Sequence, residues 1–111
     1  MSDQIVSHKL VLVMTTESSW DKANGLAKAL LVRKLVACVS LHEVNSHYWW
    51  KGELEEGKEV QLLLKTTNDL LEDVRKAVNE LHSYENPEWI YWSVSCGEDY
   101  QSWLLNTVSI K

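Results

Sequence analysis

The segment that decides the fold is NSHYWWKGELEEGKEVQLLLK, residues 45–65. Lys51-Gly52 is its strongest turn signal, and the strand-forming residues on both sides of that turn predict a long β-hairpin. A second glycine, in Glu56-Gly57-Lys58, predicts a β-bulge before the apolar strand 59–65. The hairpin is therefore expected to be the longest antiparallel unit of the sheet.

Outward from the hairpin, the hydrophobic pattern alternates between strand and helix periods. Short apolar runs rich in β-branched residues predict strands at residues 9–14 and 89–95, and a strand-like run at 36–44 leads into the first arm of the hairpin. Apolar residues at helical spacing predict three helices, at residues 23–31, 70–81 and 99–108. The first strand is apolar on both faces and is expected at the centre of the sheet. Thr16, Ser18 and Ser19 are candidate N-caps for the first helix.

The resulting order, β-α-β-β-α-β followed by a C-terminal helix, is typical of an α+β, ferredoxin-like fold. In that fold the two main helices lie on one face of a four-stranded antiparallel sheet. No linker or low-complexity stretch interrupts the chain, so residues 1–111 are expected to form a single domain.

Charge and composition exclude several classes of partner. The chain has 111 residues and a net charge of -5, with acidic residues clustered in the hairpin and no basic stripe, so nucleic-acid binding is not expected. No apolar run approaches the roughly 18 residues of a membrane span. Residues 1–7 lack the basic and apolar regions of a secretory signal, so the expected location is the cytoplasm.

Both faces of the hairpin carry aromatic side chains. Successive strand residues point to opposite faces, so Tyr48 and Trp50 share one face while Trp49 projects from the other. Each exposed Trp or Tyr leaves about 150 to 250 Å² uncovered, and several such rings exceed the patch that a soluble monomer tolerates. The sequence predicts that other copies of the chain cover these rings; a ligand cleft and an ordinary intrachain core are the alternatives.

Five groups of short motifs make the sequence more specific. In order they are Ala37-Cys-Val39, Tyr48-Trp-Trp-Lys-Gly-Glu-Leu-Glu55, Glu59-Val60 with Leu64-Lys-Thr66, Leu81-His-Ser-Tyr-Glu85 with Pro87-Glu88, and Tyr100 with Trp103-Leu104. Together they resemble the divalent-cation-tolerance family, CutA, over most of the chain. The resemblance implies a ferredoxin-like subunit in a homotrimer built by strand pairing between neighbours, similar in plan to the PII signalling proteins. It also implies a role in tolerance to copper and other divalent metals that is not enzymatic.

The same resemblance suggests where a metal ion would bind. His82 is the first candidate ligand, and Met14 is the second, at the position where copper-binding bacterial members use Cys. Leu81 replaces the first His of the family's His pair, so His82 stands alone there. The alternative is a structural His82 that hydrogen-bonds to neighbouring backbone or Glu side chains. No tightly bound cofactor is expected, and copper or zinc is the candidate metal.

These observations favour a cytosolic, trimeric binding or regulatory protein whose clefts between subunits bind a divalent metal or a small anionic molecule. The predicted cleft residues are Tyr48, Trp50, Glu59, Lys65, His82 and Tyr84. Lys65 follows an apolar strand, where a cation is costly unless an anionic ligand, Glu59 or Glu85 pairs with it. No nucleophile–base arrangement or phosphate-binding glycine loop is visible, so an enzyme is not expected. A PII-like small-molecule sensor and a stable trimeric scaffold for partner proteins are the alternatives.

Overall fold

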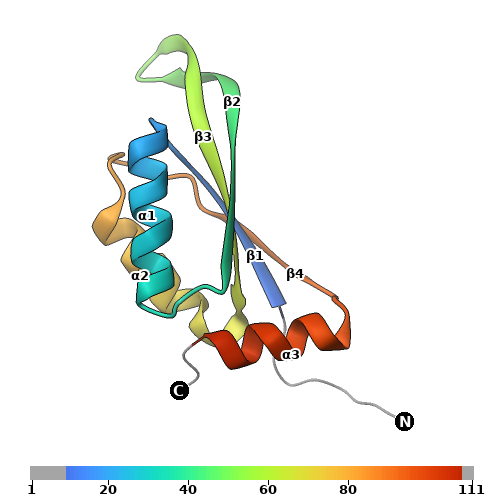
Figure 1. Ribbon diagram of the computed structural model, residues 1–111. Coiled ribbons are helices and arrows are strands. Elements are labelled where there is room, and N and C mark those ends of the chain that lie inside the picture. Colours follow the sequence, from blue (N-terminus) through green and yellow to red (C-terminus); the bar gives the residue numbers. More distant parts are fainter. Residues whose placement is uncertain (1–9, 109–111) are drawn as a thin grey trace.

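The computed structural model describes residues 10–108 and confirms the ferredoxin-like arrangement (Figure 1). Its elements are β1 (Leu10–Glu17), α1 (Trp20–Val32), β2 (Cys38–Trp50), β3 (Glu53–Thr67), a 3-10 turn (Asn68–Leu70), α2 (Leu71–Leu81), β4 (Ile90–Val94) and α3 (Glu98–Thr107). The four strands form one sheet in the order β2-β3-β1-β4, and every neighbouring pair is antiparallel. The first strand is central, as its two apolar faces predict. Residue 9, the expected start of that strand, lies outside the described residues.

Strand register divides the sheet into two different faces. Val13 of β1 is paired with Leu64 of β3, and both side chains are fully buried on the face that α1 and α2 cover. Leu26 and Leu30 of α1 belong to the same hydrophobic core. We call the other side of the sheet the open face, because α1 and α2 lie on the opposite side and α3 crosses it only near the start of β1 (Figure 1).

The first helix begins where one of the predicted caps lies. Ser19 is the N-cap of α1, and its hydroxyl oxygen accepts a hydrogen bond from the backbone N–H of Lys22 at 3.2 Å. This bond satisfies one of the N–H groups that the first helical turn leaves without a helical partner. The longest helix, α1, has 13 residues, and none of the helices in residues 10–108 is long and apolar enough to cross a membrane.

The long hairpin is present, but the predicted bulge is wrong. Pairing runs without interruption from Cys38–Lys65 to Trp50–Glu53, and Gly57 lies directly opposite Ser46. Both strands contribute the same number of residues between those two pairs, so no extra residue is left to form a bulge. Lys51 and Gly52 form the turn with φ values of 50° and 81°, the left-handed pattern that suits a two-residue hairpin turn. Figure 1 shows the hairpin extending well beyond the helices.

Candidate ligand cleft and the His82 network

Three of the predicted cleft residues meet on the open face because of strand register. Tyr48 and Trp50 alternate onto this face of β2, and Glu59 occupies the same face of β3. Together with the segment that follows α2, they border an open cleft of about 700 Å³. The cleft is lined by Thr16, Ser46, His47, Tyr48, Trp50, Glu59, Gln61, Ser83, Tyr84, Glu85, Asn86, Pro87 and Glu88.

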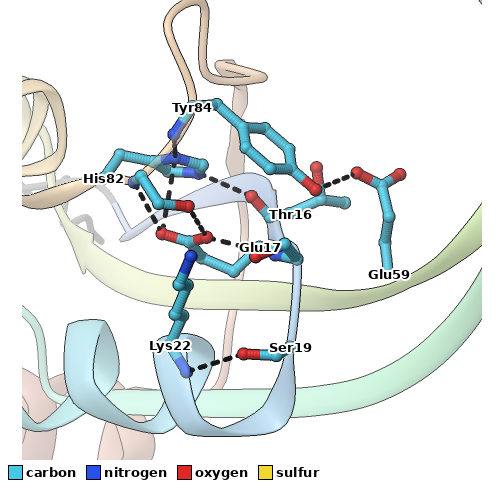
Figure 2. Close-up of polar contacts among 9 residues, drawn as sticks. Thr16, Glu17, Ser19, Lys22, Glu59, His82 and Tyr84 are labelled. Carbon is cyan, nitrogen blue, oxygen red and sulfur yellow. Dashed lines mark hydrogen bonds and ion pairs between the residues drawn. The ribbon is translucent and has the colours of Figure 1, made fainter.

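The wall of the cleft contains a tyrosine held by a carboxylate. The Tyr84 hydroxyl donates a hydrogen bond to Glu59 Oε2 at 2.5 Å (Figure 2). Burial raises the pKa of Tyr84, and the hydrogen bond to Glu59 raises it further. Tyr84 therefore stays protonated at neutral pH and acts as a donor that orients the Glu59 carboxylate.

A second carboxylate lines the cleft near Glu59. Burial raises the pKa of Glu88, and the negative charge of Glu59 raises it further, while a hydrogen bond with the Thr16 side chain opposes the rise. A positive charge in this site would stabilise the ionised form of Glu88.

Glu17 lies behind the cleft and is only 1% exposed. Its Oε1 accepts hydrogen bonds from the Ser83 hydroxyl at 2.5 Å and from the Ser18 N–H at 3.1 Å, and its Oε2 accepts one from the Ser83 N–H at 3.0 Å. Burial alone would raise the pKa of Glu17, but the hydrogen bonds from Ser83 and Ser18 outweigh it, so the pKa is lowered. The ionised carboxylate thus joins the end of β1 to the residue that follows His82.

His82 ends α2, and its side chain is completely buried. Its Nε2 lies 2.5 Å from the carbonyl oxygen of Thr16, which can only accept, so Nε2 carries a proton and donates. Its Nδ1 accepts the backbone N–H of Tyr84 at 3.0 Å (Figure 2). Nδ1 also lies 3.4 Å from Glu17 Oε2, but this contact is longer than an ordinary hydrogen bond. The bond from Tyr84 therefore decides the assignment: His82 is the neutral Nε2–H tautomer.

This tautomer leaves His82 with no free nitrogen for a metal ion, because both ring nitrogens are engaged. Within residues 10–108, no three His, Cys, Asp or Glu side chains are grouped so that they could hold a metal ion. Met14 is paired in register with Leu63 and Ile90 in the middle of the sheet. The structural alternative for His82 fits this geometry, and a copper or zinc site built on His82 does not.

The structure separates Lys65 from the cleft. Lys65 occupies the same face of β3 as Glu59 but lies six residues further along the strand, roughly 20 Å away at the rise of a β-strand. Its Nζ lies 3.7 Å from the Sγ of Cys38 on β2, and within residues 10–108 it forms no ion pair with either of the predicted partners, Glu59 and Glu85. Of the six predicted residues, Tyr48, Trp50, Glu59 and Tyr84 line the cleft, while Lys65 and His82 do not.

Sequence reasoning missed three residues that shape the site: Thr16, Glu17 and Glu88. In the sequence, Thr16 is a candidate helix cap and Glu88 is part of a motif. Glu17 gave one signal, an acidic residue that directly continues an apolar strand. Its burial depends on Ser83, which lies 66 residues later in the chain, and local patterns carry no information on that contact.

Comparison with known proteins places the chain in a family. Residues 11–107 match the family model described as CutA1 divalent ion tolerance protein. The chain belongs to this family. The divalent-cation tolerance protein CutA of Pyrococcus horikoshii is 41% identical over 97 residues, which cover 86% of this chain and 95% of the relative.

Solved CutA structures share the fold. The crystal structure of CutA1 from Pyrococcus horikoshii has a TM-score of 0.88 and 39% sequence identity, and the match covers 90% of this chain and 99% of that one. The periplasmic divalent cation tolerance protein CutA from Archaeoglobus fulgidus has a TM-score of 0.86 and 31% identity, with 90% and 99% covered. The ferredoxin-like CutA fold therefore extends over nearly all of this chain.

Proposed function

We propose that this CutA-family protein is a non-enzymatic regulatory subunit that contributes to divalent-cation tolerance by binding a small molecule in the cleft. The observation that carries the proposal is the contrast between two neighbouring sites. The cleft is open, about 700 Å³ in volume and lined by polar and aromatic side chains, whereas the His82 side chain has no exposure and both of its ring nitrogens are bonded. A cleft of this volume, with aromatic side chains and polar groups that can orient a ligand, is typical of small-molecule sites.

The contacts of His82 support a regulatory role for the cleft. Its ring joins the carbonyl of Thr16 to the N–H of Tyr84, and both residues line the cleft. His82 also ends α2, so a ligand that moves Tyr84 would act directly on the end of that helix. This connection favours the PII-like sensor over a protein that only chelates copper.

We further propose that the subunit forms the homotrimer that its aromatic surface predicts. Within residues 10–108, no strand pairs with the outer edge of β2 or of β4. Exposed rings lie on both of these edge strands, including Trp49, which is 73% exposed, and Trp92. Strand pairing between subunits would satisfy both edges and cover the rings.

The cytoplasmic location stays a prediction, since the similar protein of Archaeoglobus fulgidus is described as periplasmic.

The copper hypothesis also stays open to a direct measurement. Titration calorimetry with Cu(II) on the wild type and on His82→Gln would measure it. We expect the same heat for both proteins. A saturable signal in the wild type that is absent from His82→Gln would instead identify His82 as the metal ligand.

Ligand binding in the cleft can be tested by NMR with a fragment set that contains cationic, neutral and anionic compounds. We expect some fragments to shift the indole N–H resonance of Trp50, assigned with Trp50→Phe, and to leave that of Trp20 on α1 unchanged. If no fragment of any charge shifts the Trp50 resonance, the proposal fails and the trimeric scaffold becomes the better hypothesis.

A further inference from the structure

The charges that line the cleft are of one sign. Three carboxylates line it, from Glu59, Glu85 and Glu88, and among the described residues that border the cleft there is no Lys or Arg. The one lysine that the sequence placed here, Lys65, lies far along β3 beside Cys38. An anionic ligand beside Glu59 and Glu88 would meet repulsion with no Lys or Arg in the lining to offset it, so this part of the lining selects against anions.

The Glu88 carboxylate is also partly desolvated, which raises the benefit of a positive ligand. Burial raises the pKa of Glu88, and the charge of Glu59 adds to the effect. The hydroxyl of Tyr84 occupies one oxygen of Glu59, and no donor within residues 10–108 bonds to the other oxygen. A cation between Glu59 and Glu88 would remove their mutual repulsion and bond to both.

Aromatic rings supply a second, independent feature. Tyr48, Trp50 and Tyr84 line the same cleft as the carboxylates, and ring faces attract ammonium groups. The chain itself provides an example, because the Lys51 ammonium lies over the Trp50 ring, 5.5 Å from its centroid. Rings and carboxylates in one pocket are suited to a cation that carries carbon atoms.

A bare metal ion matches this site less well. The cleft volume of about 700 Å³ is that of a site for an organic molecule. Divalent ions need several oxygen or nitrogen ligands converging at roughly 2.0 to 2.6 Å, and within residues 10–108 no group of three candidate ligands is so arranged.

We propose that the cleft binds an organic ammonium ion, with its charged head between Glu59 and Glu88 and its carbon chain against Tyr48 and Trp50. This inference rests on the proposed function, because it names the chemical class of the ligand of the same cleft.

Three probes with the same carbon chain and different charge test the inference: n-butylammonium, n-butanol and butyrate. Each is titrated into the full-length protein while the Trp50 indole resonance is followed by NMR at low and moderate salt. We expect n-butylammonium to bind saturably and at least about 10-fold more tightly than the other two, since one charged contact is worth about one order of magnitude.

Matched variants locate the contact. Glu59→Gln and Glu88→Gln keep the shape of the side chain and the acceptor for Tyr84 or Thr16, and each is expected to weaken n-butylammonium binding about 10-fold. Glu72→Gln removes the same charge from α2, which lies on the other side of the sheet from the open face, and is expected to change the affinity less than about 2-fold. Circular dichroism confirms that each variant is folded.

The outcomes separate this inference from the proposal on which it rests. Tighter binding of n-butanol or butyrate at the Trp50 resonance would keep the ligand cleft and overturn the ammonium ion. Equal weakening by Glu72→Gln would reveal only general attraction to an acidic protein and would also overturn it. If Zn(II) shifts the Trp50 resonance and n-butylammonium does not, the cleft is a metal-binding site. Failure of all probes to shift the resonance would count against the cleft itself.

Discussion

At the scale of single residues, hydrogen bonds offset the free-energy cost of burying the Glu17 carboxylate. A buried charge without partners would be strongly destabilising, but Glu17 accepts three hydrogen bonds from Ser18 and Ser83. These bonds hold the residue after His82 in place, and His82 in turn holds Tyr84 at the cleft. The carboxylate therefore stabilises the fold and positions the cleft wall at the same time.

Replacing Glu17 by Gln tests this role. The pKa of Glu17 is lowered below its ordinary value of 4.5, so its ionised form stabilises the folded state above about pH 4.5, and this contribution is lost as the pH falls through the lowered pKa. We expect Glu17→Gln to lower the free energy of unfolding at pH 7 by about 2 kcal/mol. Urea denaturation from pH 7 to pH 3 should show a shallower loss of stability in the variant, and parallel curves for both proteins would contradict the assignment.

Glu88 is expected to behave in the opposite way. Burial and the charge of Glu59 raise its pKa above 4.5, so its ionisation opposes folding, and stability is lost as the pH rises through the interval between the ordinary and the raised pKa. Glu88→Gln should therefore raise the free energy of unfolding at pH 7 by about 0.5 kcal/mol, with no gain near pH 4. A variant that is less stable than the wild type at pH 7 would show that Glu88 is favourably paired.

At the scale of elements, alternation along strands predicted the cleft better than charge did. Tyr48, Trp50 and Glu59 share a face because the period of a strand is two residues, and this holds wherever the partner strand lies. Lys65 obeys the same alternation, yet it is too far along β3 to reach the cleft. Alternation determines on which face of the sheet a side chain lies. It does not determine which strand residues are close to the 83–88 segment. The contacts of the 83–88 segment depend on tertiary packing, which local patterns do not contain.

The two hairpin glycines offer a matched pair of substitutions. Gly52 has a φ of +81°, whereas Gly57 lies in regular strand pairing, and a Cβ added at either position meets nothing within 4 Å. Gly52→Ala should therefore lower the free energy of unfolding by about 1 kcal/mol through backbone strain alone. Gly57→Ala should be neutral or slightly stabilising, because it restricts the unfolded chain. Thermal denaturation of both variants measures the difference, and a larger loss at Gly57 would support the bulge that the sequence suggested.

At the scale of the whole molecule, the aromatic surface and the two outer strand edges point to the same assembly. Ile90, Trp92 and Val94 of β4 alternate onto the open face beside β1, and α1 and α2 cover only the opposite face. A subunit with this surface would expose several large apolar side chains in water, which monomers seldom tolerate when they form a patch. Assembly would also decide how accessible the cleft is, since Tyr48 and Trp50 lie on the same open face.

A charge placed on this face should therefore dissociate the assembly. Trp92 is 39% exposed and lies opposite Leu12 in the sheet, so Trp92→Glu would bury an unpaired carboxylate at a subunit interface, which costs several kcal/mol. Light scattering should give three times the 12.8 kDa chain mass for the wild type and a single chain mass for a folded Trp92→Glu. Val32→Glu is the control, because Val32 is 80% exposed at the end of α1, away from the open face. A wild type that scatters as a monomer, or a Trp92→Glu variant that keeps the mass of the wild type, would contradict assembly through this face.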